Sequence, residues 1–182
     1  MPKNIHVIYA HPSAHLSRVN RRLVERAASV DGVRMHALYD TYPDFYIDVA
    51  REQALLAGAD VVVFLHPIQW YSMPSLLKEW VDAVLQPGWA CGAGGDALRG
   101  KRYWLAVTTG SAKDAYSAGG AHGRPFAHYL PPFEQIAALC GMHWEPAHIL
   151  HGAHHASEAA VQAHVDAFAA RLSAFSALSE PC

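Results

Sequence analysis

Hydroxyl, guanidinium and amide side chains stand close together at Ser17, Arg18 and Asn20, where a helical pattern begins. Ser is favoured at an N-cap, and the free backbone N–H groups and positive dipole end of a helix N-terminus attract anions. Arg18 could hold a phosphate through two parallel hydrogen bonds. The plain alternative is an ordinary cap beside a solvated Arg. Because the chain has no GxxxxGKS or GxxxxGKT sequence, we expect no triphosphate held with magnesium.

A second stretch, residues 66–74, reads His-Pro-Ile-Gln-Trp-Tyr-Ser-Met-Pro and lies between an apolar run and a helical pattern. A plain connector would be small and polar, whereas this one holds two Pro, a Gln and two aromatic residues. We interpret it as a wall for a planar ring, with its backbone N–H groups held toward the polar edge of that ring. A rigid loop with exposed aromatic side chains is an equal alternative.

A third stretch runs from Thr108 to His122, begins with Thr-Thr-Gly-Ser and later contains Tyr116. Backbone N–H groups at Gly110 or Ser111 would stabilise negative charge on a reduced ring, and Tyr116 or His122 could relay a proton. A His in a surface loop is more often simply solvated, so position alone does not decide its role.

A phosphate site at 17–20 together with flat walls at 68–71 and 108–111 predicts a mononucleotide cofactor with a large heterocycle. FMN fits this combination best, and FAD fits it less well. Tyr116 and His122 are the candidates for catalytic roles. The residues expected to bind the cofactor are His11, Ser17, Arg18, Val19, Asn20, Pro67, Ile68, Gln69, Trp70, Tyr71, Thr108, Thr109, Gly110 and Ser111.

The elements that must position these stretches alternate between strand and helix patterns. The apolar run 61–65, rich in β-branched residues, indicates a strand buried on both faces of a parallel sheet. Residues 33–38 alternate in polarity, which favours a strand nearer the edge. The other strands are expected at 5–10, 102–108 and 144–150, and helices at 17–27, 49–57, 75–85, 131–139 and 156–178.

This alternation predicts one α/β domain over residues 1–182, a doubly wound five-stranded parallel sheet with helices on both faces. We expect the strand order 2-1-3-4-5 with right-handed crossovers. In such a sheet the ligand lies outside the carboxyl ends of the strands where the order reverses, here between the first and third strands. The loops 11–17, 66–73 and 108–122 should converge there.

Composition narrows the function classes. Of the 182 residues 52% are hydrophobic, enough for one domain with a sizeable core. A net charge of -2 with only 14 Lys and Arg argues against a nucleic-acid surface. No apolar run approaches the roughly 20 residues of a membrane span. Residues 1–4 lead straight into a strand, so we expect no signal peptide.

The cysteines and histidines give no sign of a metal centre. Cys91, Cys140 and Cys182 form no CxxC pair, so reduced thiols in a cytoplasmic protein are expected. Residues 151–155 contain three His, but no Cys or carboxylate at ligand spacing accompanies them, and we expect no metal site. The aromatic loop 40–46 indicates either ordinary packing or a pocket or subunit contact.

Over roughly residues 4–150 the chain resembles the flavodoxin-like NAD(P)H:quinone oxidoreductases. Residues 9–12 with 17–20 are similar to the phosphate loop of that family, residues 67–74 to its isoalloxazine loop, and residues 108–110 with 115–123 to its third loop. Tyr116 and His122 match in type and spacing the Tyr and His that assist hydride transfer in the DT-diaphorase group. Ser111 departs from the pattern, since relatives often carry a second Gly there.

Residues 38–48 and 88–90 are similar to a bacterial branch of this family. That branch contains the ancillary subunits of glutathione-gated potassium-efflux antiporters and related reductases. The resemblance therefore implies a homodimer in which the loop 42–46 and the Trp89 region complete the partner's site. It also implies a potassium-efflux antiporter as a further partner, with the protein in the cytoplasm or at the inner face of the membrane and without a nucleic-acid role.

The activity implied by the resemblance is a ping-pong reduction. NAD(P)H gives hydride to flavin N5 and leaves, and a quinone or another flat acceptor then takes its place. Two readings from other classes stay open. One is a regulatory ancillary subunit of an antiporter with secondary redox activity. The other is an electron-carrier flavodoxin, which the net charge of -2 disfavours because carriers usually need a strongly acidic docking face.

Overall fold

A computed structural model gives the fold of residues 3–178, and Met1, Pro2 and Cys182 lie outside the described residues. Its strands are β1 (Ile5–Tyr9), β2 (Val33–Ala37), β3 (Val61–Pro67), β4 (Arg102–Thr108) and β5 (His143–Leu150). Its α-helices are α1 (Arg18–Ala27), α2 (Leu38–Thr41), α3 (Val49–Ala57), α4 (Ser75–Val84), α5 (Pro131–Leu139) and α6 (Glu158–Ser176). Short 3-10 helices are η1 (Ala14–Leu16), η2 (Lys113–Ala115) and η3 (Phe126–Tyr129).

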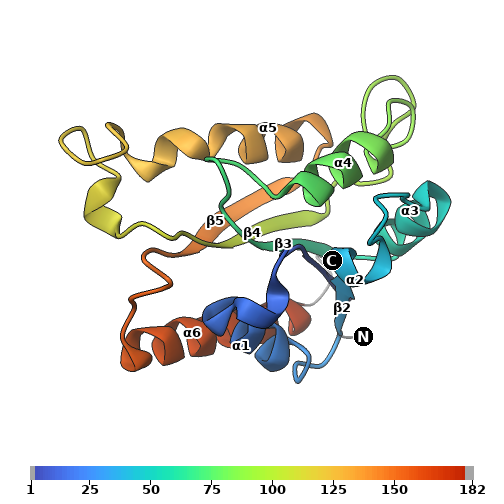
Figure 1. The fold of residues 1–182 in the computed structure, drawn as a ribbon. Helices are drawn as coiled ribbons and strands as arrows, with labels where there is room; N and C mark the ends of the chain where they lie inside the picture. Colours follow the sequence, from blue (N-terminus) through green and yellow to red (C-terminus); the bar gives the residue numbers. More distant parts are fainter. Residues whose placement is uncertain (1–2, 179–182) are drawn as a thin grey trace.

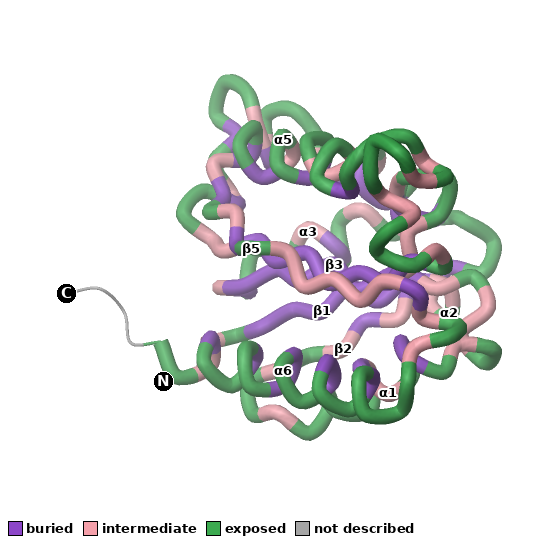
Figure 2. The backbone as a smooth tube through the Cα atoms, turned by 90° about the vertical axis from the view of Figure 1, so that its left-hand side faces the viewer, coloured by how far each residue is buried: buried purple, intermediate pink, exposed green. Residues whose placement is uncertain are grey.

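The strands form one parallel sheet in the order β2-β1-β3-β4-β5. Helices α1 and α6 cover one face, while α3, α4 and α5 lie over the other (Figure 1). The buried strands are sandwiched between these two helical layers (Figure 2). The doubly wound α/β fold, the strand order and the edge position of β2 are therefore as predicted.

Two cores flank the sheet because successive side chains of a strand point to opposite faces. Ile5, Val7 and Tyr9 of β1 pack in the cluster that includes α1 and α6, whereas Ile8 packs with side chains of α3, α4 and α5. One face of the last helix is buried against the sheet, and its apolar members are Val161, Val165, Phe168, Leu172 and Phe175. This packing makes the sheet a rigid frame for the loops at its edges.

The third strand is longer than predicted, since β3 ends at Pro67 rather than at Leu65. The equally long β4 offers a partner for each added residue, and Pro67 pairs with Thr108. Pro has no N–H to continue the ladder, so Ile68 N closes it by donating to Thr108 O at 2.8 Å. The stretch 66–74 is thus anchored to β4 before it leaves the sheet.

Several other boundaries differ from the sequence prediction by one or two residues. Leu38, expected at the end of the second strand, begins α2, where Tyr42 N donates to Leu38 O at 2.8 Å. An edge strand has no outer neighbour to hold it extended, which allows this early turn into helix. The stretch 112–129 contains η2 and η3, and the last helix, expected from residue 156, begins at Glu158 behind the N-cap Ser157.

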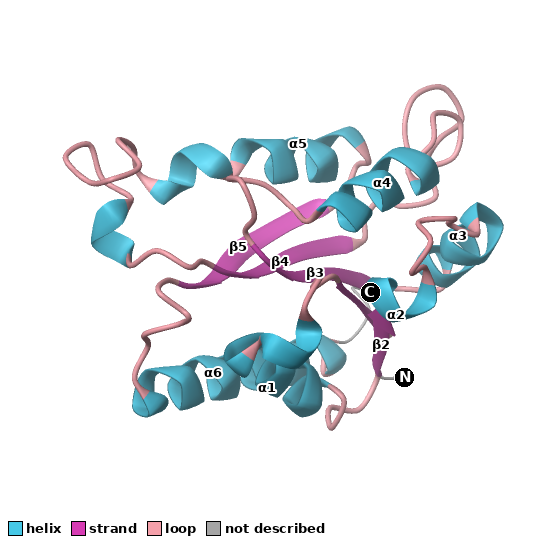
Figure 3. Ribbon diagram, in the orientation of Figure 1, coloured by secondary structure: helices cyan, strands magenta, loops and turns pink. Residues whose placement is uncertain are grey.

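All five parallel strands end at one edge of the sheet, and the loops that follow β4 and β5 gather there (Figure 3). Within residues 3–178, no helix is both long and apolar enough to span a membrane. The same residues contain no group of three or more His, Cys, Asp or Glu side chains arranged to hold a metal ion.

Candidate functional site

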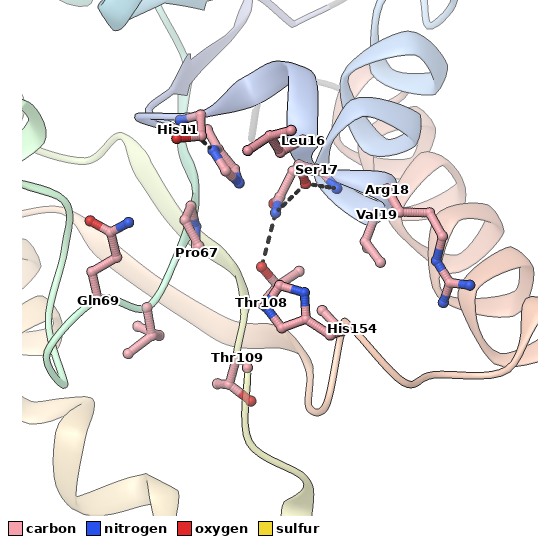
Figure 4. A pocket seen from close by; sticks show the side chains of 15 residues that line it. His11, Leu16, Ser17, Arg18, Val19, Pro67, Gln69, Thr108, Thr109 and His154 are labelled. Carbon is pink, nitrogen blue, oxygen red and sulfur yellow. Dashed lines mark hydrogen bonds between the residues drawn. The ribbon is translucent and has the colours of Figure 1, made fainter.

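A pocket of about 410 Å³ opens at the carboxyl edge, between the N-terminus of α1, the end of β3, the end of β4 and the β5–α6 loop (Figure 4). Its lining includes every predicted cofactor-binding residue except Trp70, Tyr71 and Ser111. The three loops that were expected to converge do so. The pocket also takes in residues that sequence reasoning missed, which are Ser13, Leu16, Ala153 and His154.

The missed residues have a common explanation in the topology. Ala153 and His154 follow β5, whose carboxyl end lies beside that of β4 because the two strands are parallel neighbours. The only available signal was the strand order, which places every β–α loop at the same edge. Ser13 and Leu16 belong to the predicted first loop, where η1 turns them toward the cavity.

The N-terminus of α1 opens onto the pocket with its first-turn groups exposed to it. Ser17 is the N-cap, and its Oγ accepts a hydrogen bond from Asn20 N at 3.0 Å. The N–H groups of Arg18 and Val19 stand earlier in the first turn, where a helix offers them no internal acceptor. They face the cavity with the positive end of the helix dipole.

Arg18 lines the pocket and also makes a contact that the sequence did not predict. Its guanidinium donates to Ala156 O, and the side chain extends from α1 toward the start of α6 (Figure 4). This hydrogen bond ties the first helix to the β5–α6 loop. The remaining guanidinium N–H groups are still available at the rim of the pocket.

Asn20 is the most informative side chain of the site. It is 2% exposed, and its Nδ2 donates to Ser17 Oγ at 3.1 Å and to Thr108 Oγ1 at 2.9 Å. Its Oδ1, in contrast, is buried without a hydrogen-bond partner among the described residues. A buried acceptor with no donor usually finds one in a ligand or an ordered water. Asn20 therefore marks a place where the cavity lacks an external donor.

His11 offers a donor to the same cavity. Its Nδ1 accepts from Ser13 N at 3.1 Å, so the neutral ring carries its proton on Nε2. Burial lowers the pKa of His11, and the nearby His15 and His154 lower it further, although a backbone hydrogen bond opposes them. At neutral pH the ring is therefore an uncharged N–H donor in the pocket wall.

The second loop makes a tight reversal at residues 69–72. Gln69 N donates to Ser72 O at 2.9 Å and Ser72 N donates to Gln69 O at 3.0 Å, while Trp70 and Tyr71 have φ of 46° and 66°. Positive φ at both central residues describes a type I′ turn, which is normally made with Asn and Gly. Positive φ strains the backbone of a residue other than Gly, and such strain is concentrated at functional sites. Trp70 is 93% exposed.

Tyr116 and His122 lie together beside the pocket but outside its lining. Their rings stack with centroids 4.3 Å apart. Tyr71 adds its hydroxyl at 3.4 Å from His122 Nδ1 and stacks on Tyr129 at 5.0 Å. His122 Nε2 has no partner within the described part of the chain. The structure thus gathers the two predicted catalytic residues and one predicted wall residue into an aromatic cluster next to the cavity.

This arrangement can hold an anion at one end, present N–H groups and hydroxyls along its length, and place proton-carrying side chains beside a flat surface. The Tyr71, Tyr116 and His122 side chains come from two loops that follow different strands. Only the parallel sheet brings them together. The combination suits a ligand with a phosphate tail and a planar head.

Three comparisons with known proteins agree on the fold. Residues 3–172 match the Flavodoxin_2 family model, described as a flavodoxin-like fold. The glutathione-regulated potassium-efflux system ancillary protein KefF of Klebsiella aerogenes is 48% identical over 145 residues, which cover 80% of this chain and 81% of that protein.

Solved structures give the same picture. General stress protein 14 of Treponema denticola, in complex with FMN, is 38% identical with a TM-score of 0.87, covering 94% of this chain and 99% of that one. An NADPH-quinone reductase from P. pentosaceus is 28% identical with a TM-score of 0.84, covering 93% and 97%.

Proposed function

The chain belongs to the Flavodoxin_2 family, which has a flavodoxin-like fold, and on that premise we propose that it is an FMN-dependent NAD(P)H:quinone oxidoreductase. The observation that carries the proposal is the pocket at the carboxyl edge, which combines an anion-binding helix N-terminus with walls for a flat ring. Similarity to a protein in complex with FMN and to an NADPH-quinone reductase supports it. Residues 1–182 are taken as a single FMN-binding domain.

The pocket fits FMN in volume and in donor set. Its volume of about 410 Å³ falls in the range of about 300–1,000 Å³ that is usual for ligand sites. The first turn of α1, with Ser17 and Arg18, holds the phosphate. The unpartnered Oδ1 of Asn20 would accept a hydrogen bond from a hydroxyl group of the bound cofactor. When bound, FMN supplies a centre that accepts hydride and passes both electrons on.

The walls of the pocket position the ring. Ile68 and Gln69, which follow β3, and Thr108, Thr109 and Gly110, at the end of the neighbouring β4, all line the pocket. With FMN bound, the N–H groups at Gly110 and Ser111 would stabilise the negative charge that reduction places on the ring. Trp70 and Tyr71 stand at the open side, where a flat reactant would enter.

Tyr116 and His122 hold the proton that accompanies hydride transfer. His122 Nε2 is free of partners in residues 3–178, so it can give or take a proton without breaking an existing bond. Stacking on Tyr116 and contact with the Tyr71 hydroxyl fix the orientation of the ring. NAD(P)H and the quinone use this place in turn, which is a ping-pong scheme.

A steady-state assay with NADPH or NADH and 1,4-naphthoquinone tests the proposed activity. The expected result is FMN-dependent oxidation of the nicotinamide, with parallel lines in double-reciprocal plots at several quinone concentrations. Intersecting lines would remove the ping-pong scheme. The FMN-loaded protein should also be assayed with both nicotinamides and with azo and nitroaromatic acceptors. If it turns over none of these combinations, the proposed enzymatic activity is wrong.

We also propose a homodimer. Exposed apolar side chains lie on the segments that follow β1, β2 and β3, and they include Leu16 at 76%, Tyr46 at 83% and Trp70 at 93% exposure. Apolar side chains this exposed are typical of contact surfaces when they gather together. Sedimentation velocity should give the mass of two chains, and a monomer at micromolar concentration would contradict the assignment.

A second candidate function is supported by the 48% identity to an ancillary protein of a potassium-efflux system. In that reading the chain binds an antiporter, and its redox activity is secondary. Co-purification with an antiporter from the same source separates the two functions, because a free-standing reductase has no such partner. Full quinone turnover in the absence of the antiporter favours the reductase.

A further inference from the structure

Thr109, in the pocket wall, is hydrogen-bonded to a histidine that no part of the proposed function uses. Thr109 Oγ1 donates to Ser111 O at 2.8 Å, and the same oxygen lies 3.0 Å from His151 Nδ1. A hydroxyl has one proton, and here it is already committed to the Ser111 carbonyl. The Thr109 oxygen must therefore accept, and His151 Nδ1 must carry the hydrogen.

This assignment fixes the tautomer of His151. A neutral imidazole with its proton on Nδ1 has a bare Nε2, so the ring is an Nδ1–H donor and an Nε2 acceptor. Burial lowers the pKa of His151, and the nearby Lys113 lowers it further, which keeps the ring neutral at physiological pH. The usual freedom of a surface histidine to exchange tautomers is removed by one hydrogen bond.

The same ring supports the proposed catalytic pair. The His151 centroid is 5.2 Å from that of Tyr116 and 5.0 Å from that of Phe126, and Phe126 packs edge-on against Tyr116 at 5.1 Å. Tyr116 in turn stacks on His122 at 4.3 Å. A continuous set of contacts therefore leads from the pocket wall at Thr109 through His151 to the Tyr116–His122 pair.

The backbone around this contact is hydrogen-bonded to the β5–α6 loop. Thr109 O accepts from Ala153 N at 2.9 Å, and Ser111 O accepts from Gly152 N at 2.8 Å as well as from the Thr109 hydroxyl. The two loops thus meet through both backbone and side-chain bonds. Among these bonds, only the Thr109–His151 bond reaches the aromatic cluster.

We propose that His151 is a positioning residue, which uses its Nδ1–H bond to Thr109 to hold Tyr116 and His122 in register with the ring-binding wall. The proposal rests on the proposed function, since it assigns a role within the same site. His151 itself does not carry the transferred proton. Its effect is to set where the Tyr116–His122 pair stands relative to the pocket.

The first test needs neither cofactor nor turnover. In ¹⁵N-histidine-labelled protein at neutral pH, long-range ¹H–¹⁵N spectra distinguish a protonated from an unprotonated ring nitrogen. His151, identified by the signals lost in His151→Asn, should show a protonated Nδ1 and an unprotonated Nε2. Thr109→Val should shift it toward the Nε2–H form, while Thr109→Ser should not. A wild-type His151 in the Nε2–H form would overturn the proposal.

The second test measures flavin reduction by NAD(P)H in stopped flow. His151→Phe keeps an aromatic ring against Tyr116 but lacks the donor, and we expect its limiting rate to fall about fivefold, the effect of one lost hydrogen bond. His151→Asn places an amide N–H near the position of Nδ1 and should stay within about twofold of wild type. His143→Asn, at the exposed first residue of the same strand, is the matched control and should not change the rate.

Combining Thr109→Val with His151→Phe separates coupling from general damage. If the two side chains act through one bond, the double variant should be no slower than about the slower single variant. Equal losses in His151→Asn and His151→Phe, or multiplicative losses in the double variant, would overturn the proposal. A wild-type protein that binds no FMN would instead remove the proposed function, while the tautomer measurement would still judge the Thr109–His151 bond.

Discussion

Asn20 Nδ2 donates a 2.9 Å hydrogen bond to Thr108 Oγ1, joining the first turn of α1 to the last residue of β4 across the floor of the pocket. The two residues are 88 positions apart in the chain. Because the amide nitrogen is used in this contact and in a bond to Ser17 Oγ, the amide oxygen is left without a donor. The structural bond thus determines which atom of Asn20 is offered to a ligand.

Replacing Asn20 should therefore cost more FMN affinity than replacing its partner. Asn20→Ala removes the unpartnered acceptor, and we expect FMN to bind about tenfold more weakly, as for one lost hydrogen bond in a dry site. Thr108→Val keeps the Asn20 oxygen and removes only its anchor, so its effect should be smaller. Fluorescence quenching titrations with FMN measure both, and equal affinities in wild type and Asn20→Ala would contradict the assignment.

Replacing the proposed proton-handling pair should slow flavin reduction without abolishing FMN binding. For Tyr116→Phe and His122→Gln we expect the rate of flavin reduction by NAD(P)H to fall about 10- to 100-fold, toward the range of positioned acid–base groups. Ser117→Ala, in the same loop, is the control. Stopped-flow absorbance provides the rate, and variants that retain the original rate would show that the assigned role is wrong.

Glu52 should be essential for folding although it is far from the proposed chemistry. It is fully buried, and its carboxylate accepts from Tyr42 Oη at 2.6 Å and Trp80 Nε1 at 2.9 Å, with His36 Nε2 at 3.0 Å. Burial raises the pKa of Glu52, but the hydrogen bonds from His36, Tyr42 and Trp80 outweigh it and hold that pKa below its ordinary value. Three buried donors depend on this one group.

Glu52→Ala should accordingly lower the free energy of unfolding by about 3–5 kcal/mol, because it leaves buried polar groups without their acceptor. Tyr42→Phe removes only one of the bonds and should cost about 1 kcal/mol. Urea denaturation followed by circular dichroism measures both. A Glu52→Ala protein as stable as Tyr42→Phe would contradict the view that the carboxylate organises this cluster.

Acid should destabilise the fold from mildly acidic pH downward because of its buried neutral histidines. Burial lowers the pKa of His66 from 6.5 to about 4, against a weaker opposite effect of its hydrogen bond to Pro67 O. Burial also lowers the pKa of His6 to about 4, with His36 and Arg34 adding to the effect and Glu52 opposing it. Below pH 6.5, the pKa of an ordinary histidine, these two side chains bind protons in the unfolded chain. In the folded chain they stay neutral until about pH 4.

The free energy of unfolding should therefore decrease as pH is lowered across that window. Its slope against pH should reflect about one proton for each such histidine. His66→Gln should remove about one proton from the slope between pH 6 and pH 4.5, whereas the exposed His128→Gln should not. Urea unfolding at several pH values measures the slope. An unchanged slope in His66→Gln would mean that His66 is protonated in the folded state.

The alternation of strand and helix patterns was enough to predict the architecture. A short run rich in β-branched residues, such as 61–65, is best explained as a buried strand. Boundaries were less predictable. The third strand was predicted to end at Leu65. The observed β3 continues through Pro67 because β4 provides a partner for two more residues. That partner is distant in sequence, so no local pattern around Pro67 could reveal it.

The site divides in the same way. Ser17 and Asn20 were identifiable because a cap and the first turn of a helix are local features. His151 and His154 could be recognised only as histidines in an ordinary loop. His151 contacts Thr109 and His154 lines the pocket because β4 and β5 are neighbours in the sheet. Arg18 was predicted to grip a phosphate, but its bond to Ala156 O comes from the packing of α1 beside α6, which the sequence does not encode locally.

The most direct test of the proposed function is the visible spectrum of the purified protein, followed by titration of the cofactor-free form with FMN. The account predicts a yellow protein with flavin absorbance that is bleached by NAD(P)H and restored by a quinone, and one FMN bound per chain. A colourless protein whose spectrum and fluorescence show no binding of added FMN would contradict it.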